Sequence, residues 1–144
     1  MAKAIEMASP LIEQRTHTLT VKVPRRGLRV DGDATRLSQV VSNLLTNAAK
    51  YTPPGGNISV RAEQVDDEVV LTVRDTGIGI SREVLPRIFE LFVQERQALD
   101  RSQGGLGIGL TIVRSLIERH GGSVQMTGHA LRRRPEWSGH EARW

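Results

Sequence analysis

The chain has 144 residues, which is the size of one ordinary domain and enough to bury a core without disulfides or metals. Cysteine is absent, which excludes disulfides, thiolate metal sites and cysteine nucleophiles, and no apolar run reaches the length of a membrane span or a signal peptide. The formal net charge is +4, and half of this excess of positive charge lies in residues 129–144. The rest of the chain is nearly balanced in charge and has few aromatic residues, so we expect no nucleic-acid partner. We also expect a cytoplasmic protein without membrane contacts.

The first third of the chain predicts a helix, a strand and a second, stronger helix. Residues 2–14 have apolar positions at helical spacing. Residues 19–23 alternate as a strand that Pro24 ends, and residues 28–30 are expected to return as a short partner strand. Asp33 is a suitable N-cap for the next helix, whose apolar residues stand at positions 37, 40, 41, 44, 45 and 48 and which Pro53 ends.

The remainder predicts a hairpin, two helical stretches and a further strand. Residues 58–62 and 69–73 alternate as strands joined by a turn at Asp66 and Asp67. Residues 84–92 are helix-like, residues 93–103 are expected to form a mobile loop, and residues 106–120 form a helix that Gly121 caps. Residues 123–126 suit one more strand. Because strands and helices are segregated along the chain, we expect an α+β fold, a two-layer α/β sandwich.

Three polar residues of the strongest helix share one face. Asn43, Asn47 and Lys50 stand at i, i+4 and i+7, apart from the apolar face. Amide oxygens are hard metal ligands and lysine is a point charge, so the trio suits a Mg²⁺–phosphate complex. The same spacing also fits an ordinary solvated polar face.

The segment from Asp75 to Ile80 follows a predicted strand and reads Asp-Thr-Gly-Ile-Gly-Ile. An aspartate at a strand end can accept a hydrogen bond from an exocyclic amine such as that of adenine, and the two glycines permit close approach of a flat ligand. A simple turn with an aspartate cap explains the same residues.

A glycine-rich run, residues 104–109, leads into a helix, where free backbone N–H groups favour phosphate binding. A P-loop is excluded because Leu110 follows Gly109 where lysine is needed, although Thr111 is in place. The dinucleotide fingerprint also fails, since the spacing is Gly-x-Gly-x-Gly after a polar loop.

In this order the three segments resemble the sequence boxes of sensor histidine kinases. Residues 43–52 resemble the N box, residues 75–80 the G1 box, residues 89–92 (Phe-Glu-Leu-Phe) the F box and residues 104–109 the G2 box. The resemblance covers about residues 16–126. It implies the Bergerat ATP-binding fold shared with gyrase, Hsp90 and MutL, in which a mixed sheet lies under helices and ATP lies beneath a flexible lid.

The resemblance implies a role for each matched residue. Asn47 is expected to bind Mg²⁺, Asn43 and Lys50 to act at the phosphates as catalytic residues, and Asp75 to accept from the adenine amine. Arg101, in a lid formed by residues 93–103, is the third expected catalytic residue and reaches the γ-phosphate. The other expected nucleotide-binding residues are Tyr51, Gly77, Gly79, Phe89, Phe92, Gly105, Leu106, Gly107, Gly109 and Thr111.

Two features depart from that family's pattern. None of the four histidines lies in the context of the phosphoacceptor histidine, and His17 is expected to be a surface residue. We therefore expect residues 1–15 to be a helical lead-in from a missing dimerisation segment and residues 16–127 to be the catalytic domain. Residues 128–144 are expected to be an atypical basic tail that does not supply the sheet's closing strand, because alternation is missing and Pro135 cannot donate to a central ladder.

Three functions remain open. The first is transfer of the γ-phosphoryl group of Mg·ATP to a histidine on a separate domain, with a response regulator receiver domain as the further partner and with the isolated chain monomeric. The second is an ATP hydrolase of the gyrase–Hsp90 type, whose members carry glutamate at the position of Asn43. An amide cannot take a proton from water, which argues against it. The third is a nucleotide-binding module without catalysis.

Overall fold

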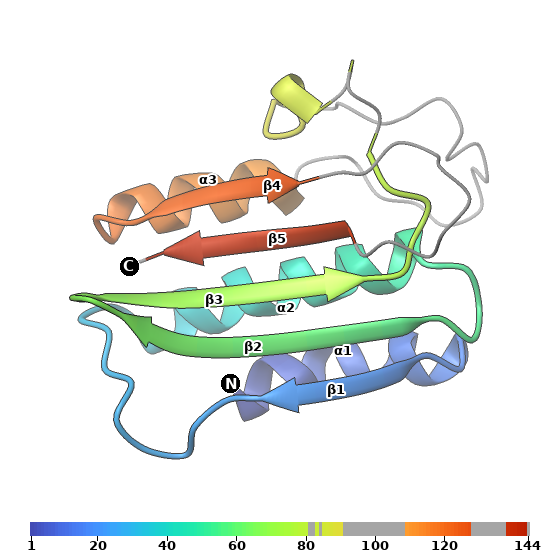
Figure 1. Cartoon of the computed structure of the whole chain (residues 1–144), viewed down its shortest axis with the longest axis horizontal. Helices are drawn as coiled ribbons and strands as arrows, with labels where there is room; N and C mark the ends of the chain where they lie inside the picture. Colours follow the sequence, from blue (N-terminus) through green and yellow to red (C-terminus); the bar gives the residue numbers. More distant parts are fainter. Residues whose placement is uncertain (81–82, 84, 91–108, 128–137, 144) are drawn as a thin grey trace.

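The computed structural model describes residues 1–80, 83, 85–90, 109–127 and 138–143. They form two layers, a sheet and a set of helices that covers one of its faces (Figure 1). The α+β, two-layer architecture expected from the sequence is therefore confirmed. The elements are α1 (Ala2–Gln14), β1 (Thr18–Lys22), α2 (Ala34–Tyr51), β2 (Asn57–Val65), β3 (Glu68–Asp75), the 3-10 turn η1 (Leu85–Arg87), α3 (Gly109–Arg119), β4 (Ser123–Thr127) and β5 (Ser138–Arg143).

The sheet is mixed, with the strand order β1-β2-β3-β5-β4. β1 pairs with β2 in parallel, and all other pairs are antiparallel. The predicted hairpin is present and turns at Asp66, whose φ is +53°. The prediction of a strand at residues 28–30 is wrong, because these residues join no ladder and β1 is the edge strand beside β2. Leu28 and Val23 instead pack against the core from the connection between β1 and α2.

Helix α2 is the centre of the helical layer. Its N-terminus is closed as predicted, since the Asp33 carboxylate accepts hydrogen bonds from the amides of Thr35 at 2.8 Å and Arg36 at 3.1 Å. These bonds, first that from Arg36, hold the pKa of Asp33 below its usual range. The apolar face of α2 is buried against the sheet, and its largest residues, Leu44 and Leu45, are fully inaccessible.

Helix α1 packs into the same core as α2. Its inward residues Ala4, Ala8 and Ile12 are buried, and the two alanines let the helices approach closely. Residues 1–15 therefore belong to the same folded unit as the rest of the chain. The expectation that His17 lies at the surface is wrong, because the chain passes under the end of α2 there. His17 is only 9% exposed, and its Nε2 lies 2.9 Å from the Ala49 carbonyl oxygen.

The expectation that residues 128–144 supply no closing strand is also wrong. β5 lies inside the sheet, between β3 and β4. Ladder hydrogen bonds use only backbone groups, so a strand can form without alternating apolar side chains. Toward the helices, the small apolar residue Ala142 is enough to continue the core, because it is fully buried beside Leu71 and Val124 of the neighbouring strands. Pro135 precedes β5, so it removes no donor from the part of the ladder that is described. The segment from Leu131 to Trp137 lies outside the described residues.

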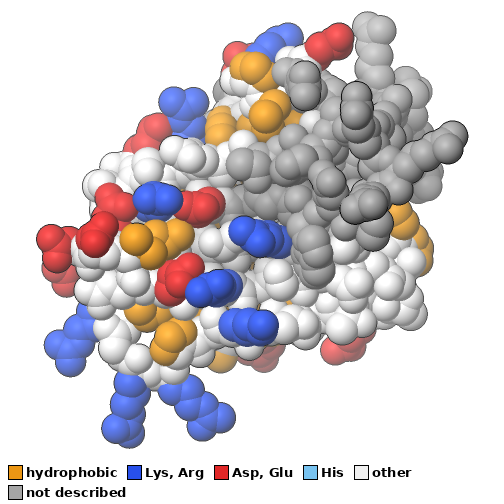
Figure 2. Space-filling model, in the orientation of Figure 1, with side chains coloured by type: hydrophobic (Ala, Val, Ile, Leu, Met, Phe, Trp, Pro, Cys, Tyr) orange, Lys and Arg blue, Asp and Glu red, His pale blue; other side chains and the backbone are white. Residues whose placement is uncertain are grey.

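The other face of the sheet is polar, and acidic and basic side chains alternate across it (Figure 2). Arg61 pairs with Glu63 and Arg143 with Glu141, each at 2.7 Å.

Of the two predicted helical stretches after the hairpin, residues 85–87 form one 3-10 turn and α3 is described from Gly109. Gly121 caps α3 with a φ of +74°, as expected. Within the described part of the chain, no helix has the length and apolar character needed to cross a bilayer.

Candidate functional site

The C-terminal half of α2 carries the three polar residues that the sequence placed on one face. Asn43, Asn47 and Lys50 are each half-buried, whereas Thr46 beside them is exposed. They therefore lie along the border of the apolar face and not on a fully solvated one. This position brings Asn43 next to the start of α3 and Lys50 next to Tyr51 at the end of α2.

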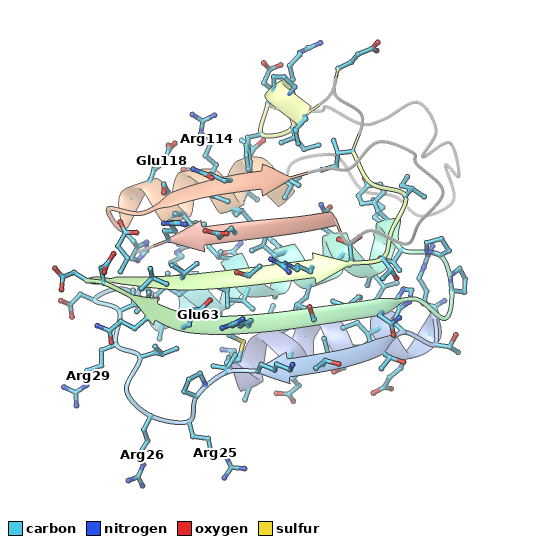
Figure 3. The ribbon with its side chains drawn as sticks, in the orientation of Figure 1. Arg25, Arg26, Arg29, Glu63, Arg114 and Glu118 are labelled. Carbon is cyan, nitrogen blue, oxygen red and sulfur yellow. The ribbon has the colours of Figure 1, made fainter. Side chains whose placement is uncertain are left out.

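The first residue of α3 flanks α2 on one side. The amide nitrogen of Asn43 donates to the Gly109 carbonyl oxygen at 3.5 Å, which leaves the amide oxygen of Asn43 for a ligand. Thr111 donates through its hydroxyl to the Phe89 carbonyl oxygen at 2.9 Å. The Arg114 guanidinium lies 6.0 Å from the Phe89 ring centroid, and Figure 3 shows Arg114 projecting from α3. Asn43, Phe89, Gly109 and Thr111 are thus brought together.

The turn after β3 meets the C-terminal end of α2. Asp75, the last residue of β3, is buried, and its Oδ1 accepts a hydrogen bond from the Gly77 amide at 2.8 Å. The turn rests on the end of α2, because the Ile78 amide donates to the Tyr51 carbonyl oxygen at 3.2 Å. The turn cap expected from the sequence is therefore present, and acceptance from an adenine amine stays a prediction for this buried carboxylate.

Glycine is required at position 77 by contact. A Cβ atom there would meet Asp75 Oδ1 at 2.5 Å and the Tyr51 carbonyl oxygen at 2.7 Å. Gly79 has a φ of +75°, a conformation that other residues adopt only with strain. The two glycines therefore keep the turn close to α2 and hold Asp75 in place.

Lys50 is half-buried at the end of α2. Its Nζ lies 5.6 Å from the ring centroid of Tyr51. Burial, and next the neighbouring Arg15 guanidinium, hold the pKa of Lys50 below its usual value. A partly desolvated ammonium gains from an anionic ligand, since the ligand replaces the hydration that burial removed.

Sequence reasoning missed two residues that support this site. Arg15 donates from Nη1 to the carbonyl oxygens of Lys50 at 3.1 Å and Thr52 at 3.3 Å, so it caps the end of α2 from the α1–β1 connection. Thr52 is fully buried, and its hydroxyl donates to the Ala48 carbonyl oxygen at 2.6 Å. No local pattern marks Arg15, because its partners lie more than thirty positions along the chain.

The donor set fits a magnesium–phosphate complex better than an all-protein metal site. Within the described ranges, no group of three or more His, Cys, Asp or Glu side chains is placed to hold a metal ion. The amide oxygens of Asn43 and Asn47 are hard ligands, and Mg²⁺ in proteins keeps water and substrate phosphate oxygens as its other ligands. Arg101, Phe92, Gly105, Leu106 and Gly107, which were also predicted as site residues, lie outside the described residues.

Residues 32–140 match the family described as histidine kinase-, DNA gyrase B-, and HSP90-like ATPase. Over 125 residues, 87% of this chain, it is 34% identical to sensor protein KdpD of Clostridium acetobutylicum, of which the match covers 14%. Over 127 residues, 88% of this chain, it is 36% identical to the signal transduction histidine-protein kinase/phosphatase MprB of Mycobacterium ulcerans, of which the match covers 24%.

Among solved structures, the fold is similar to that of a mycobacterial sensor histidine kinase MprB. The TM-score is 0.83 at 30% sequence identity, and the match covers 99% of this chain and 92% of the other. The chain thus spans less than a quarter of the length of these two curated relatives but nearly the whole of a solved structure from a sensor kinase.

Proposed function

Because the chain belongs to the family of histidine kinase-, DNA gyrase B- and HSP90-like ATPases, we propose that it binds Mg·ATP and transfers the γ-phosphoryl group to a histidine on a separate dimerisation domain. The observation that carries this proposal is the junction at the end of α2. There the buried Asp75 and the Gly77 turn lie against the helix that bears Asn43, Asn47 and Lys50.

Asp75 is the residue for recognition of the base. A buried carboxylate accepts a hydrogen bond from the exocyclic amine of adenine, and guanine carries a carbonyl oxygen at that position, which a carboxylate repels. One oxygen of Asp75 is oriented by the Gly77 amide. In this assignment Tyr51, Gly77 and Gly79 border the base, and the absence of a side chain at Gly77 keeps Asp75 in its place.

The phosphate end of the nucleotide belongs with Asn43, Asn47 and Lys50. In this assignment Asn47 holds magnesium through its amide oxygen, Asn43 assists, and the Lys50 ammonium contacts a phosphate oxygen. Bound magnesium supplies charge neutralisation on the phosphoryl group that is transferred. Gly109 and Thr111 at the start of α3 adjoin Asn43 and complete the described part of this end. Arg101 stays a prediction for the γ-phosphate.

The residue types favour transfer over hydrolysis. An amide cannot accept a proton, so Asn43 does not serve as a base for water, and the nucleophile must come from a partner. A histidine on a dimerisation domain is that partner, and a response regulator receiver domain is the next acceptor in a cytoplasmic two-component pathway. Positioning and charge neutralisation by the chain's own residues then carry the reaction.

The test is phosphoryl transfer from radiolabelled ATP, with Mg²⁺, to a purified dimerisation domain bearing the acceptor histidine of a related sensor kinase. We expect label on the acceptor, no label on the chain alone, and no transfer with Asn47→Ala. Release of inorganic phosphate without label on any acceptor would indicate a hydrolase. Nucleotide binding without either product would indicate a binding module. Sedimentation of the isolated chain should show a monomer.

A further inference from the structure

A cavity of about 300 Å³ lies at the end of α2 opposite the nucleotide site. The β1–α2 connection covers it with Leu28 and Val30, the first turns of α2 contribute Leu37 and Val41, and the sheet contributes Ala62 and Leu71. Among the described residues that line it, Ser38 alone has a polar side chain. The cavity is partly open to solvent, and an apolar group that enters it gains contacts with these apolar walls.

The connection that covers the cavity is apolar inward and basic outward. Val23, Leu28 and Val30 are half-buried at the cavity. Arg25, Arg26 and Arg29 are exposed, and Figure 3 shows them projecting away from the body of the protein at this end. The same end carries a group of Lys and Arg side chains at the lower left of Figure 2.

These three arginines have no acidic partner in the described structure, where every ion pair joins other residues. Two acidic residues, Asp31 and Asp33, follow in the same connection, so its three guanidinium groups exceed its carboxylates by one. The rim of the cavity therefore has a net positive charge directly beside an apolar interior.

We infer that this cavity is a second binding site for a small anionic amphiphile. Such a ligand has one apolar part, an alkyl chain or two fused rings, and one anionic head group such as a carboxylate. A cavity of ~150 Å³ takes up benzene, so a volume twice as large suits a medium-length alkyl chain or a naphthyl group. The apolar body fills the space between α2 and the sheet, and the head meets the guanidinium groups at the rim.

The site is separate from the nucleotide site but lies on the same helix. Ser38 at the cavity and Asn47 at the nucleotide site are nine positions apart, which is roughly 14 Å along the helix axis. A ligand in the cavity therefore touches neither Asn47 nor Asp75. Saturation with ADP is accordingly expected to leave binding at the cavity in place.

The test uses decanoate and decan-1-ol as matched probes on the purified chain, with affinities from titration followed by ¹H–¹⁵N spectra. We expect decanoate to bind about tenfold more tightly than the alcohol, because exposed guanidinium groups each add a modest attraction. Replacing all three arginines of the rim (Arg25→Gln, Arg26→Gln and Arg29→Gln) should remove that tenfold difference and leave alcohol binding unchanged. Removing three remote arginines, with Arg61→Gln, Arg74→Gln and Arg119→Gln, should retain the difference.

Filling the cavity is the second arm. Ser38→Leu should abolish binding of both probes, whereas Ser115→Leu, at an exposed position of α3, should alter neither. Ala34→Leu, at the first residue of α2 and also on the cavity wall, gives an independent filling variant if Ser38→Leu does not fold. Equal affinity for acid and alcohol would overturn the anionic head. Binding that survives in a folded filling variant, or no binding by either probe, would overturn the site.

Discussion

Gly77→Ala tests whether the close packing of the turn after β3 against α2 holds the proposed nucleotide site together. Ordinary contact of a Cβ atom begins at 3.4 Å, so the new methyl group would be 0.9 Å too close to Asp75 Oδ1 and 0.7 Å too close to the Tyr51 carbonyl oxygen. The two obstacles belong to different elements, one to β3 and one to α2. The turn must therefore move away from the helix.

The movement has a calculable cost. Overpacking costs roughly 1–3 kcal/mol, and loss of the Ile78–Tyr51 hydrogen bond adds about 1 kcal/mol, so we expect about 2–4 kcal/mol of lost stability. Urea unfolding should show a lower midpoint with an unchanged slope. Because the shift also displaces Asp75 by some tenths of an ångström from the base, calorimetric titration of the folded variant should show affinity for Mg·ATP reduced about tenfold or more.

The matched control is Gly121→Ala. Gly121 has a φ of +74° at the end of α3, with open space around its Cβ position, so alanine costs about 1 kcal/mol through backbone strain alone. That variant should lose stability without losing nucleotide affinity. Wild-type affinity in a folded Gly77→Ala protein would refute the reasoning, and so would equal affinity losses in the two variants.

Four further outcomes follow from the same structure. Asp75→Asn should weaken adenine nucleotides more than guanine nucleotides, which competition titrations measure; equal losses would contradict the assignment of the base acceptor. Asn47→Ala should abolish the Mg²⁺ dependence of nucleotide binding in a folded protein, and an unchanged Mg²⁺ titration would remove Asn47 as a ligand. Burial, and next Arg15, lower the pKa of Lys50 in the folded state, so at alkaline pH below 10.5 the unfolded state binds more protons than the folded state. Lys50 therefore makes the free energy of unfolding increase with pH in that range. This increase should be smaller in Lys50→Met, as measured by unfolding at a series of alkaline pH values. His120→Ala should cost ~1 kcal/mol, because Nε2 of His120 accepts a hydrogen bond from the amide of the residue that caps α2, 3.1 Å away; an unchanged unfolding midpoint would deny that link.

The sequence predicted the features that depend on neighbours in the chain. The spacing of Leu44, Leu45 and Ala48 sets the buried face of α2, and the Asp33 cap needs only the next three residues. The hairpin and the turn at Asp75 are equally local. These local signals placed Asn43, Lys50 and Asp75 on the elements where the structure has them.

Features that depend on distant partners were missed. His17 is buried because its ring meets Ala49, and Arg15 caps α2 through carbonyls that are remote in sequence. β5 has little alternation of its own, and the neighbouring strands β3 and β4 supply the backbone partners that make it a strand. The expectation that residues 128–144 supply no strand rested on their side-chain pattern, whereas backbone amides and carbonyls make the hydrogen bonds of the sheet.

The place of β5 also determines the order in which this sheet can be assembled during synthesis. β5 follows every other described element along the chain, yet it separates β3 from β4 in the sheet. While a ribosome is still making residues before Ser138, β1, β2 and β3 can pair and α3 can pack on α2, but β4 has no strand to join. The nascent chain then exposes an unpaired strand edge, and such edges promote association between chains. A stop in translation before Ser138 would leave a sheet of β1, β2 and β3 and would leave β4 without its partner strand.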